Sequence, residues 1–198
     1  MTGGMGFIGS TLVDYLINND IEVFVIDDMS TGKEVNRNSL ANYLPIGVDA
    51  LNPGDALCGM FDNDLDWIFH LAAKTSVQES IEYPKLYNES NVLGLLNMLC
   101  LARDIGAKSF VFSSSSAVYG DVAYTPTDET HGTDPMSPYG ASKLIGEIYC
   151  RNFFKTYGLR STCLRYFNVY GDRQHSEGSY APVIGKFMDQ KNNGLPMT

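Results

Sequence analysis

Short apolar runs alternate with amphipathic helical stretches along the chain, and this alternation limits the possible folds more than any other feature. Strands that are apolar throughout and separated by helices are typical of a parallel sheet covered on both faces. The sequence therefore predicts an α/β fold with a doubly wound parallel sheet. We expect strands over residues 22–27, 45–49, 67–72, 109–113 and 161–167, and helices over 7–18, 84–105, 138–157 and from 181 onward.

Composition argues against several classes of protein. The 198 residues include 14 Lys plus Arg against 23 Asp plus Glu, a net charge of −9, whereas nucleic-acid binding needs concentrated positive charge. No apolar stretch approaches the roughly 20 residues of a membrane span, and no signal peptide is visible. The four cysteines are scattered without a C-x-x-C pair, which is typical of buried thiols in the reducing cytoplasm. We expect a cytoplasmic protein with no metal site, no membrane contact and no nucleic-acid partner.

A glycine-rich segment, TGGMGFIGS, occupies residues 2–10. Its glycines fit both G-x-G-x-x-G and G-x-x-G-x-x-G, and either spacing brings backbone N–H groups against a pyrophosphate at a helix N-terminus. A plain glycine-rich turn would look the same in isolation. The next predicted strand ends at Asp27, where a carboxylate would accept hydrogen bonds from the ribose hydroxyls and repel a 2′-phosphate. These features predict NAD in preference to NADP, with Asp28 as a solvated turn residue.

The strand that should precede this glycine-rich segment is missing from the sequence. Met1 occupies what would be its last position. That strand is normally central, and without it the two neighbouring strands would leave backbone N–H and C=O groups unpaired. The simplest interpretation is a truncated chain that lacks its first strand.

The segment SPYGASK, residues 137–143, has the features of a helix start, with serine as N-cap and proline at the first helical position. Tyr139 and Lys143 then lie one turn apart on one face, where the ammonium would lower the pKa of the tyrosine and make it a general base. The preceding strand runs into four serines, residues 113–116. A hydroxyl there can bridge the tyrosine and a substrate hydroxyl, although a serine-rich turn that caps a helix has the same composition.

Seven blocks occur in order along almost the whole chain: TGGMGFIGS, VFVIDDMSTG, HLAA, NVLG, SSSSAVYG, SPYGASK and LRYFNVYG. Together they resemble the extended short-chain dehydrogenase/reductase family, and within it the NAD-dependent nucleotide-sugar epimerases and dehydratases. The later segment RQHSEGSYAPVIGKF resembles the branch of UDP-glucose and UDP-N-acetylglucosamine 4-epimerases. The resemblance implies a Rossmann-like NAD-binding domain over 1–178, incomplete at its N-terminus. It also implies that 179–198 begin a substrate-binding portion, most of which the chain lacks.

The resemblance also implies a role for each matching position. Ser115, Tyr139 and Lys143 would form the catalytic triad. Asn168 would contact the substrate diphosphate, and Ser115 and Tyr139 would contact the sugar. Phe167 would lie near the nicotinamide. The cofactor contacts would come from Gly3, Gly6, Phe7, Ile8, Gly9, Asp27, Asp49, Ala72, Ala73, Tyr139, Lys143 and Tyr166.

The implied reaction is 4-epimerisation of a UDP-hexose or UDP-N-acetylhexosamine. The tyrosine would take the C4 hydroxyl proton while hydride passes to NAD, and hydride would return to the opposite face of a 4-keto sugar. Related 4,6-dehydratases carry Thr-Asp-Glu where this chain reads Ser115-Ser116-Ala117, so the acid and base for eliminating water are absent. A dehydratase or another NAD-dependent modifier of nucleotide sugars is the alternative. A catalytically inert fragment with residual nucleotide binding is a second alternative.

Three further expectations concern positions outside these motifs. The helices near 84–105 and 138–157 are expected to pair with a second subunit in a homodimer, although their apolar excess is equally compatible with an ordinary core. His70 is expected to be a core residue rather than a catalyst. Whether Lys74 reaches the cofactor is left open by the sequence.

Overall fold

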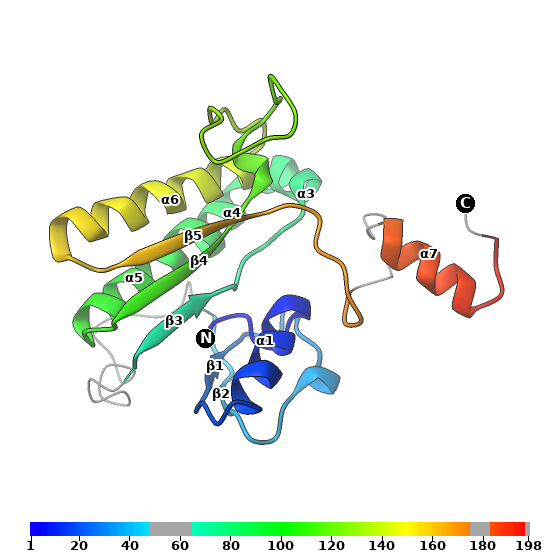
Figure 1. Ribbon diagram of the computed structural model, residues 1–198, viewed down its shortest axis with the longest axis horizontal. Coiled ribbons are helices and arrows are strands. Elements are labelled where there is room, and N and C mark those ends of the chain that lie inside the picture. Colours follow the sequence, from blue (N-terminus) through cyan, green and yellow to red (C-terminus); the bar gives the residue numbers. More distant parts are fainter. Residues whose placement is uncertain (48–64, 175–182, 197–198) are drawn as a thin grey trace.

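The computed structural model describes residues 1–47, 65–174 and 183–196. Its strands form two groups, and every described strand pair is parallel, as predicted (Figure 1). In the first group β1 (Phe24–Ile26) pairs with β2 (Asn42–Leu44). The second group has the order β3-β4-β5 and consists of β3 (Trp67–His70), β4 (Ser109–Ser115) and β5 (Ser161–Tyr166).

Helices connect these strands and cover them. α5 and α6 lie along β4 and β5, whereas α1 lies beside β1 and β2 (Figure 1). The part of the chain that the structure describes contains no helix both long and apolar enough to cross a membrane. The helices are α1 (Phe7–Ile17), α3 (Val77–Glu82), α4 (Pro84–Tyr87), α5 (Gly94–Asp104), α6 (Pro138–Tyr157) and α7 (Val183–Asn192), with short 3-10 turns η1 (Glu34–Asn36) and η3 (Ser116–Val118) and a π-helical turn η2 (Asn88–Leu93).

Thr2 joins the two groups of strands into one sheet. It forms isolated parallel bridges to Ile26 of β1 and to His70 of β3. Its amide donates to the Phe69 carbonyl at 2.9 Å, and the Gly3 amide donates to the Ile26 carbonyl at 2.9 Å. The order is therefore β2-β1-Thr2-β3-β4-β5, a doubly wound arrangement whose winding reverses at Thr2. Residues 1–3 thus occupy the centre of the sheet, between β1 and β3.

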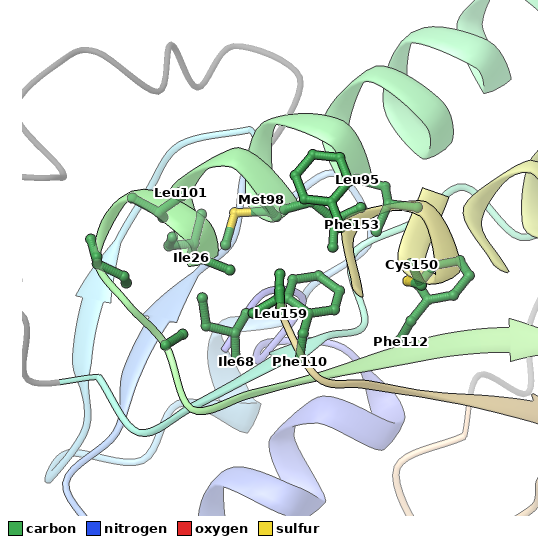
Figure 2. Close-up of a cluster of buried hydrophobic side chains, with 14 residues drawn as sticks. Ile26, Ile68, Leu95, Met98, Leu101, Phe110, Phe112, Cys150, Phe153 and Leu159 are labelled. Atoms are coloured by element: carbon green, nitrogen blue, oxygen red, sulfur yellow. The ribbon is translucent and has the colours of Figure 1, made fainter. Parts of the chain in front are cut away.

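The larger hydrophobic core lies between the strands and the helices α5 and α6 (Figure 2). Ile68 and Phe110 extend from β3 and β4 towards this layer, and Phe112 lies near Cys150 of α6. Cys150 is buried as a free thiol, as expected for a small apolar side chain. A second cluster packs α1 against β1 and consists of Met5, Val13, Val23 and Val25. The sheet is therefore covered by helices on both faces.

The local signals that predict α6 are confirmed. The Ser137 hydroxyl accepts a hydrogen bond from the Gly140 amide at 3.1 Å, and Pro138 is the first helical residue. At the other end Gly158 has a φ of +73°, a left-handed conformation that glycine adopts without strain. These caps fix both ends of the helix that carries Tyr139.

Two predicted elements differ in the structure. The helix expected over 84–105 is confirmed in extent but is divided into α4, η2 and α5. The strand expected over 45–49 lies earlier, over Asn42–Leu44, because Pro45 has no N–H to donate to a neighbouring strand. Residues 48 and 49 lie outside the described residues.

His70 is confirmed as a core residue, and it should make the stability of the fold depend on pH. Its ring is 1% exposed, and its Nδ1 is hydrogen-bonded to the Thr2 hydroxyl at 2.9 Å. Burial lowers the pKa of His70 from 6.5 to about 3, so the folded protein excludes a proton that the unfolded chain takes up below 6.5. The contribution of His70 to stability should therefore be complete above pH 7 and fall by about 2 kcal/mol towards pH 5.

The free energy of unfolding in urea, measured at pH 7 and at pH 5, gives this loss of stability. His70→Asn keeps an acceptor for Thr2 but cannot titrate, so its stability should change less over the same interval. His131→Asn, in the loop after β4, is the matched control and should keep the wild-type dependence. Equal pH dependence in His70→Asn and wild type would contradict the assignment.

Candidate active site

A cavity of about 1260 Å³ opens at the carboxyl ends of β1, β3 and β4. Doubly wound sheets bind their ligands at this edge, beside the point where the winding reverses. The cavity is lined by almost all described residues for which the sequence predicts a role: Gly3, Gly6, Phe7, Ile8, Gly9, Asp27, Ala72, Ala73, Ser115, Tyr139, Lys143 and Tyr166. Residues from six of the seven sequence blocks therefore meet in one place.

Two predicted site residues are not among those that line the cavity. Asn168 is exposed, while its neighbours Phe167 and Val169 line the cavity. Asp49 lies outside the described residues. Lys74, whose contact with the cofactor the sequence leaves open, does line the cavity.

The glycine-rich segment is folded as a turn that leads into α1. Gly3 has a φ of +71°, and Gly6 is the N-cap of α1 without a side chain to bond the first amides. A Cβ on Gly9 would lie 2.1 Å from the Gly3 carbonyl oxygen, so the helix can approach the turn only with glycine there. A Cβ on Gly4 would instead meet the Val25 side chain at 2.6 Å. The spacing of Gly3, Gly6 and Gly9 is thus the one that shapes the turn, whereas Gly4 serves packing.

This turn fits a pyrophosphate. The first turn of α1 contains no acidic residue and no capping side chain, so its N–H groups and the positive end of the helix dipole are available to an anion. The Ser113 hydroxyl at the far side of the cavity is buried and has no partner among the described residues. A nicotinamide dinucleotide would offer polar groups both to the amides of the first turn of α1 and to the Ser113 hydroxyl.

Asp27 is held in place by the glycine-rich turn itself. One carboxylate oxygen accepts from the Met5 amide and the other from the Met29 amide, each at 2.9 Å. Each oxygen keeps a second lone pair for a ribose hydroxyl. Asp28 also lines the cavity, but it is exposed and its carboxylate accepts from the Ser30 amide in a local turn.

The serine, tyrosine and lysine of the predicted triad come from two elements. Ser115 is the last residue of β4, and Tyr139 and Lys143 lie on successive turns of α6. The Ser115 hydroxyl is close enough to the Tyr139 phenol to lower the pKa of the tyrosine. The Lys143 ammonium donates to the Ser113 carbonyl at 2.9 Å and lies 5.9 Å from the centre of the Tyr139 ring.

Burial changes the proton affinities of both α6 residues. It lowers the pKa of Lys143 to about 8, because the buried ammonium loses its hydration. It raises the pKa of Tyr139, and the contact with Ser115 lowers that pKa only in part. The expectation that the ammonium and a nicotinamide cation together lower the tyrosine pKa stays a prediction. The ammonium is directed to the Ser113 carbonyl, and Ser115 is the neighbour that favours the phenolate.

Asn91 is a site residue that the sequence interpretation missed. It is buried in the π-helical turn η2, where its side-chain amide accepts from the Lys74 amide at 2.8 Å and donates to the Lys74 carbonyl at 2.9 Å. It also donates to the Ser142 hydroxyl, which in turn donates to the Tyr139 carbonyl at 2.7 Å. The block NVLG contained the signal, since an asparagine that is buried needs hydrogen-bond partners. Asn91 thereby ties the cavity wall at Lys74 to the helix that carries the triad.

Metal chemistry has no evident ligand set here. Within the described ranges, no group of three or more His, Cys, Asp or Glu side chains is placed to hold a metal ion. The class of protein is instead defined by the glycine-rich turn, the acid after the next strand and the Ser–Tyr–Lys cluster at one sheet edge. Together these define a dinucleotide-binding domain of the short-chain dehydrogenase/reductase type.

Comparison with known proteins gives the family. The chain matches the NAD dependent epimerase/dehydratase family over residues 1–198, and it belongs to that family. It is 36% identical to the UDP-glucose 4-epimerase of Mycolicibacterium smegmatis, over 96% of this chain and 61% of that protein. It is 36% identical to the UDP-glucose 4-epimerase of Azospirillum brasilense, over 92% of this chain and 52% of that protein.

Solved structures agree. A UDP-N-acetylglucosamine 4-epimerase from Methanobrevibacter ruminantium, in complex with UDP-N-acetylmuramic acid, has a TM-score of 0.89 at 40% identity. A Thermus thermophilus UDP-glucose 4-epimerase, in complex with NAD, has a TM-score of 0.88 at 37% identity. Both comparisons cover 98% of this chain and 62% of the other. The chain thus has the Rossmann-like fold of these NAD-dependent enzymes and spans about three-fifths of their length.

Gly9→Ala tests the shape of the cofactor turn. Alanine normally stabilises a helix interior by about 1 kcal/mol over glycine, but here its Cβ would collide with the Gly3 carbonyl. We expect a loss of about 2 kcal/mol or more in the free energy of unfolding, measured in urea, because backbone must move. Gly132→Ala is the control, since a Cβ there meets nothing within 4 Å. A Gly9→Ala protein as stable as the control variant would show that the turn is looser than described.

Proposed function

We propose that the protein containing this chain interconverts the C4 epimers of a UDP-hexose or UDP-N-acetylhexosamine. The observation that carries the proposal is the Ser115–Tyr139–Lys143 cluster, which faces the same cavity as the glycine-rich turn and Asp27. The UDP-sugar 4-epimerases among the relatives support the choice of substrate class. The alternative of a purely nucleotide-binding chain does not account for a tyrosine and a serine in contact beside a buried lysine at this edge.

The chemistry can be assigned to named groups. NAD, when bound, supplies an acceptor for the C4 hydride and returns it to the other face of the sugar. Tyr139 takes the proton of the C4 hydroxyl, so that the C4–O bond becomes a carbonyl, and gives it back when the hydride returns. Ser115 holds that hydroxyl against the tyrosine, and Lys143 holds a positive charge below the ring. No proton or electron is gained or lost over the cycle.

Dehydration is disfavoured by the acids of the cavity. Elimination of water needs a carboxylate near the sugar. Of the described residues that line the cavity, only Asp27 and Asp28 are acidic, and both follow β1 on the other side of the glycine-rich turn from Ser115. Ala117 donates its amide to Ser115 and has no side chain for acid–base work.

The remaining assignments belong to the same proposal. Asp27 binds the adenosine ribose and selects NAD, and Tyr166 and Phe167 lie near the nicotinamide. Asn168 reaches the substrate diphosphate. Residues 1–178 form the cofactor domain, and 179–198 begin the substrate-binding portion. The protein acts in the cytoplasm, which its described cysteines, all free thiols, support.

Tyr139→Phe tests the reaction. We expect kcat for UDP-sugar epimerisation to fall by about 10²-fold or more, because the phenolic proton acceptor is lost. The ring is retained, so the rise in melting temperature that NAD⁺ produces should persist. Tyr15→Phe, at a tyrosine that is 64% exposed on α1, is the matched control and should keep the wild-type rate. A Tyr139→Phe enzyme with the wild-type kcat would exclude Tyr139 as the base.

The proposed assembly is a homodimer formed through the helices near 84–105 and 138–157, which are α4, η2, α5 and α6 in the structure. These helices pack on each other and still leave apolar side chains in solvent, among them Leu93, Ile148 and Phe154. An interface with a second subunit would remove these apolar side chains from solvent.

Ile148→Asp should therefore shift the molar mass of the protein, measured by light scattering, from dimer towards monomer. Val35→Asp is the control, because Val35 is 86% exposed on a different surface. A wild-type protein that is monomeric at high concentration would contradict the proposed dimer.

A further inference from the structure

A buried ion pair outside the cavity lies directly behind the triad. Glu147 is on α6, one turn beyond Lys143, and its side chain is 9% exposed. Arg165 is on β5, immediately before Tyr166, and its side chain is 19% exposed. The Arg165 Nε donates to Glu147 Oε1 at 2.9 Å and its Nη2 donates to Oε2 at 2.8 Å. This is the two-pronged geometry that fixes a guanidinium relative to a carboxylate in both distance and angle.

A third residue completes the arrangement. The Ser114 hydroxyl donates to Glu147 Oε1 at 2.6 Å. Ser114 and Arg165 are register partners across β4 and β5, so their side chains project from the same face of the sheet. One carboxylate therefore connects β4, β5 and α6. Each of the three residues lies next to a residue of the site. Ser114 precedes Ser115 on β4, Arg165 precedes Tyr166 on β5, and Glu147 lies one turn from Lys143 on α6.

The charges of this pair are maintained in spite of burial. Burial alone would raise the pKa of Glu147, but the hydrogen bonds from Arg165 and Ser114 outweigh it and leave that pKa below its ordinary value. The same pairing raises the pKa of Arg165. Buried ion pairs cost much of their attraction in lost hydration and often add little to stability. What such a pair does provide is a fixed geometry between the elements it joins.

That geometry matters for one contact above all. The contact between Ser115 and Tyr139 crosses from β4 to α6, and through it Ser115 favours the tyrosine phenolate. A small slide or rotation of α6 relative to β4 would lengthen it. The Ser114–Glu147 hydrogen bond spans the same two elements, two helical turns further along α6.

We infer that Glu147 and Arg165 are positioning residues for the reaction, which rests on the proposed function. They hold α6 against β4 and β5 so that Tyr139 stays in contact with Ser115. Neither side chain lines the cavity, so their influence on the substrate passes through the triad.

Arg165 has further neighbours, which makes Glu147 the cleaner position to change. Its guanidinium carbon lies 4.8 Å from the centre of the Tyr119 ring, and its Nη1 lies 3.5 Å from the Glu129 carbonyl oxygen. Replacing Arg165 would therefore also disturb the loop between β4 and α6. Glu147→Gln keeps the volume and an acceptor for Ser114 while removing the charge that holds the guanidinium.

The test compares Glu147→Gln with wild type in the full-length enzyme. We expect kcat to fall about tenfold or more while KM for the UDP-sugar changes little, because misplacement of a reacting group affects the chemical step. The acid limb of the pH profile of kcat should move to higher pH, because Tyr139 loses the contact that lowers its pKa. A role in stability alone would not move this limb. Glu34→Gln removes the exposed ion pair with Arg37 and, as the control, should change neither quantity.

An unchanged kcat and pH limb in Glu147→Gln would overturn the inference. If that variant does not fold, Ser114→Ala and Arg165→Lys each remove part of the same arrangement and should give smaller shifts in the same direction. If the wild-type enzyme binds NAD⁺ but epimerises no UDP-sugar, the proposed function fails and the positioning role is still measurable. Ultraviolet titration of the phenolate, assigned by its loss in Tyr139→Phe, should then show a higher midpoint in Glu147→Gln. An unshifted midpoint would overturn the inference in that case.

Discussion

The backbone hydrogen bonds made by Thr2 and Gly3 hold the two groups of strands in one sheet, and the site depends on them. β1 carries Asp27 at its carboxyl end, whereas β4 carries Ser115. In the described sheet residues 1–3 connect these two groups, because Met1 and Gly3 bond to β1 and Thr2 bonds to the end of β3. The same residues lead at once into the glycine-rich turn. This junction therefore sets the distance between the triad and Asp27, the acid that would hold the ribose. At the same junction the side chains of Thr2 and His70 are hydrogen-bonded to each other.

Burial and hydrogen bonding work against each other at the triad. Burial disfavours the phenolate form of Tyr139, and Ser115 favours it. The Lys143 ammonium is committed to a carbonyl at the end of β4 and loses part of its own proton affinity through burial. The reactivity of the proposed base thus depends on the contact between Ser115 on β4 and Tyr139 on α6. This explains why ordered connections between α6 and its neighbours, through Asn91 on one side and Glu147 on the other, are found so close to the triad.

Much of the fold could be predicted from local sequence. The Ser-Pro start and the glycine end of α6 are short-range signals, and apolar runs between helices predict a parallel sheet. Other features depend on contacts between distant residues. Spacing indicates a helix near Asn91 but not the extra residue that makes its turn π-helical. The pKa of Tyr139 depends on burial, which the i,i+4 spacing to Lys143 does not reveal. The pairing of Glu147 with Arg165 requires the register of β4 and β5, which the sequence does not state.

The distribution of charge explains how an acidic chain can hold an anionic cofactor. The chain carries a net charge of −9, so long-range attraction does not favour a pyrophosphate. Local dipoles replace it, since the first turn of α1 has uncapped amides and no acid. The nearest predicted acid, Asp27, accepts hydrogen bonds from the Met5 amide of the glycine-rich turn and from the Met29 amide after β1, which spread its charge into the backbone. Asp27 can therefore be close enough to bind ribose hydroxyls while the pyrophosphate is held by N–H groups a few residues away.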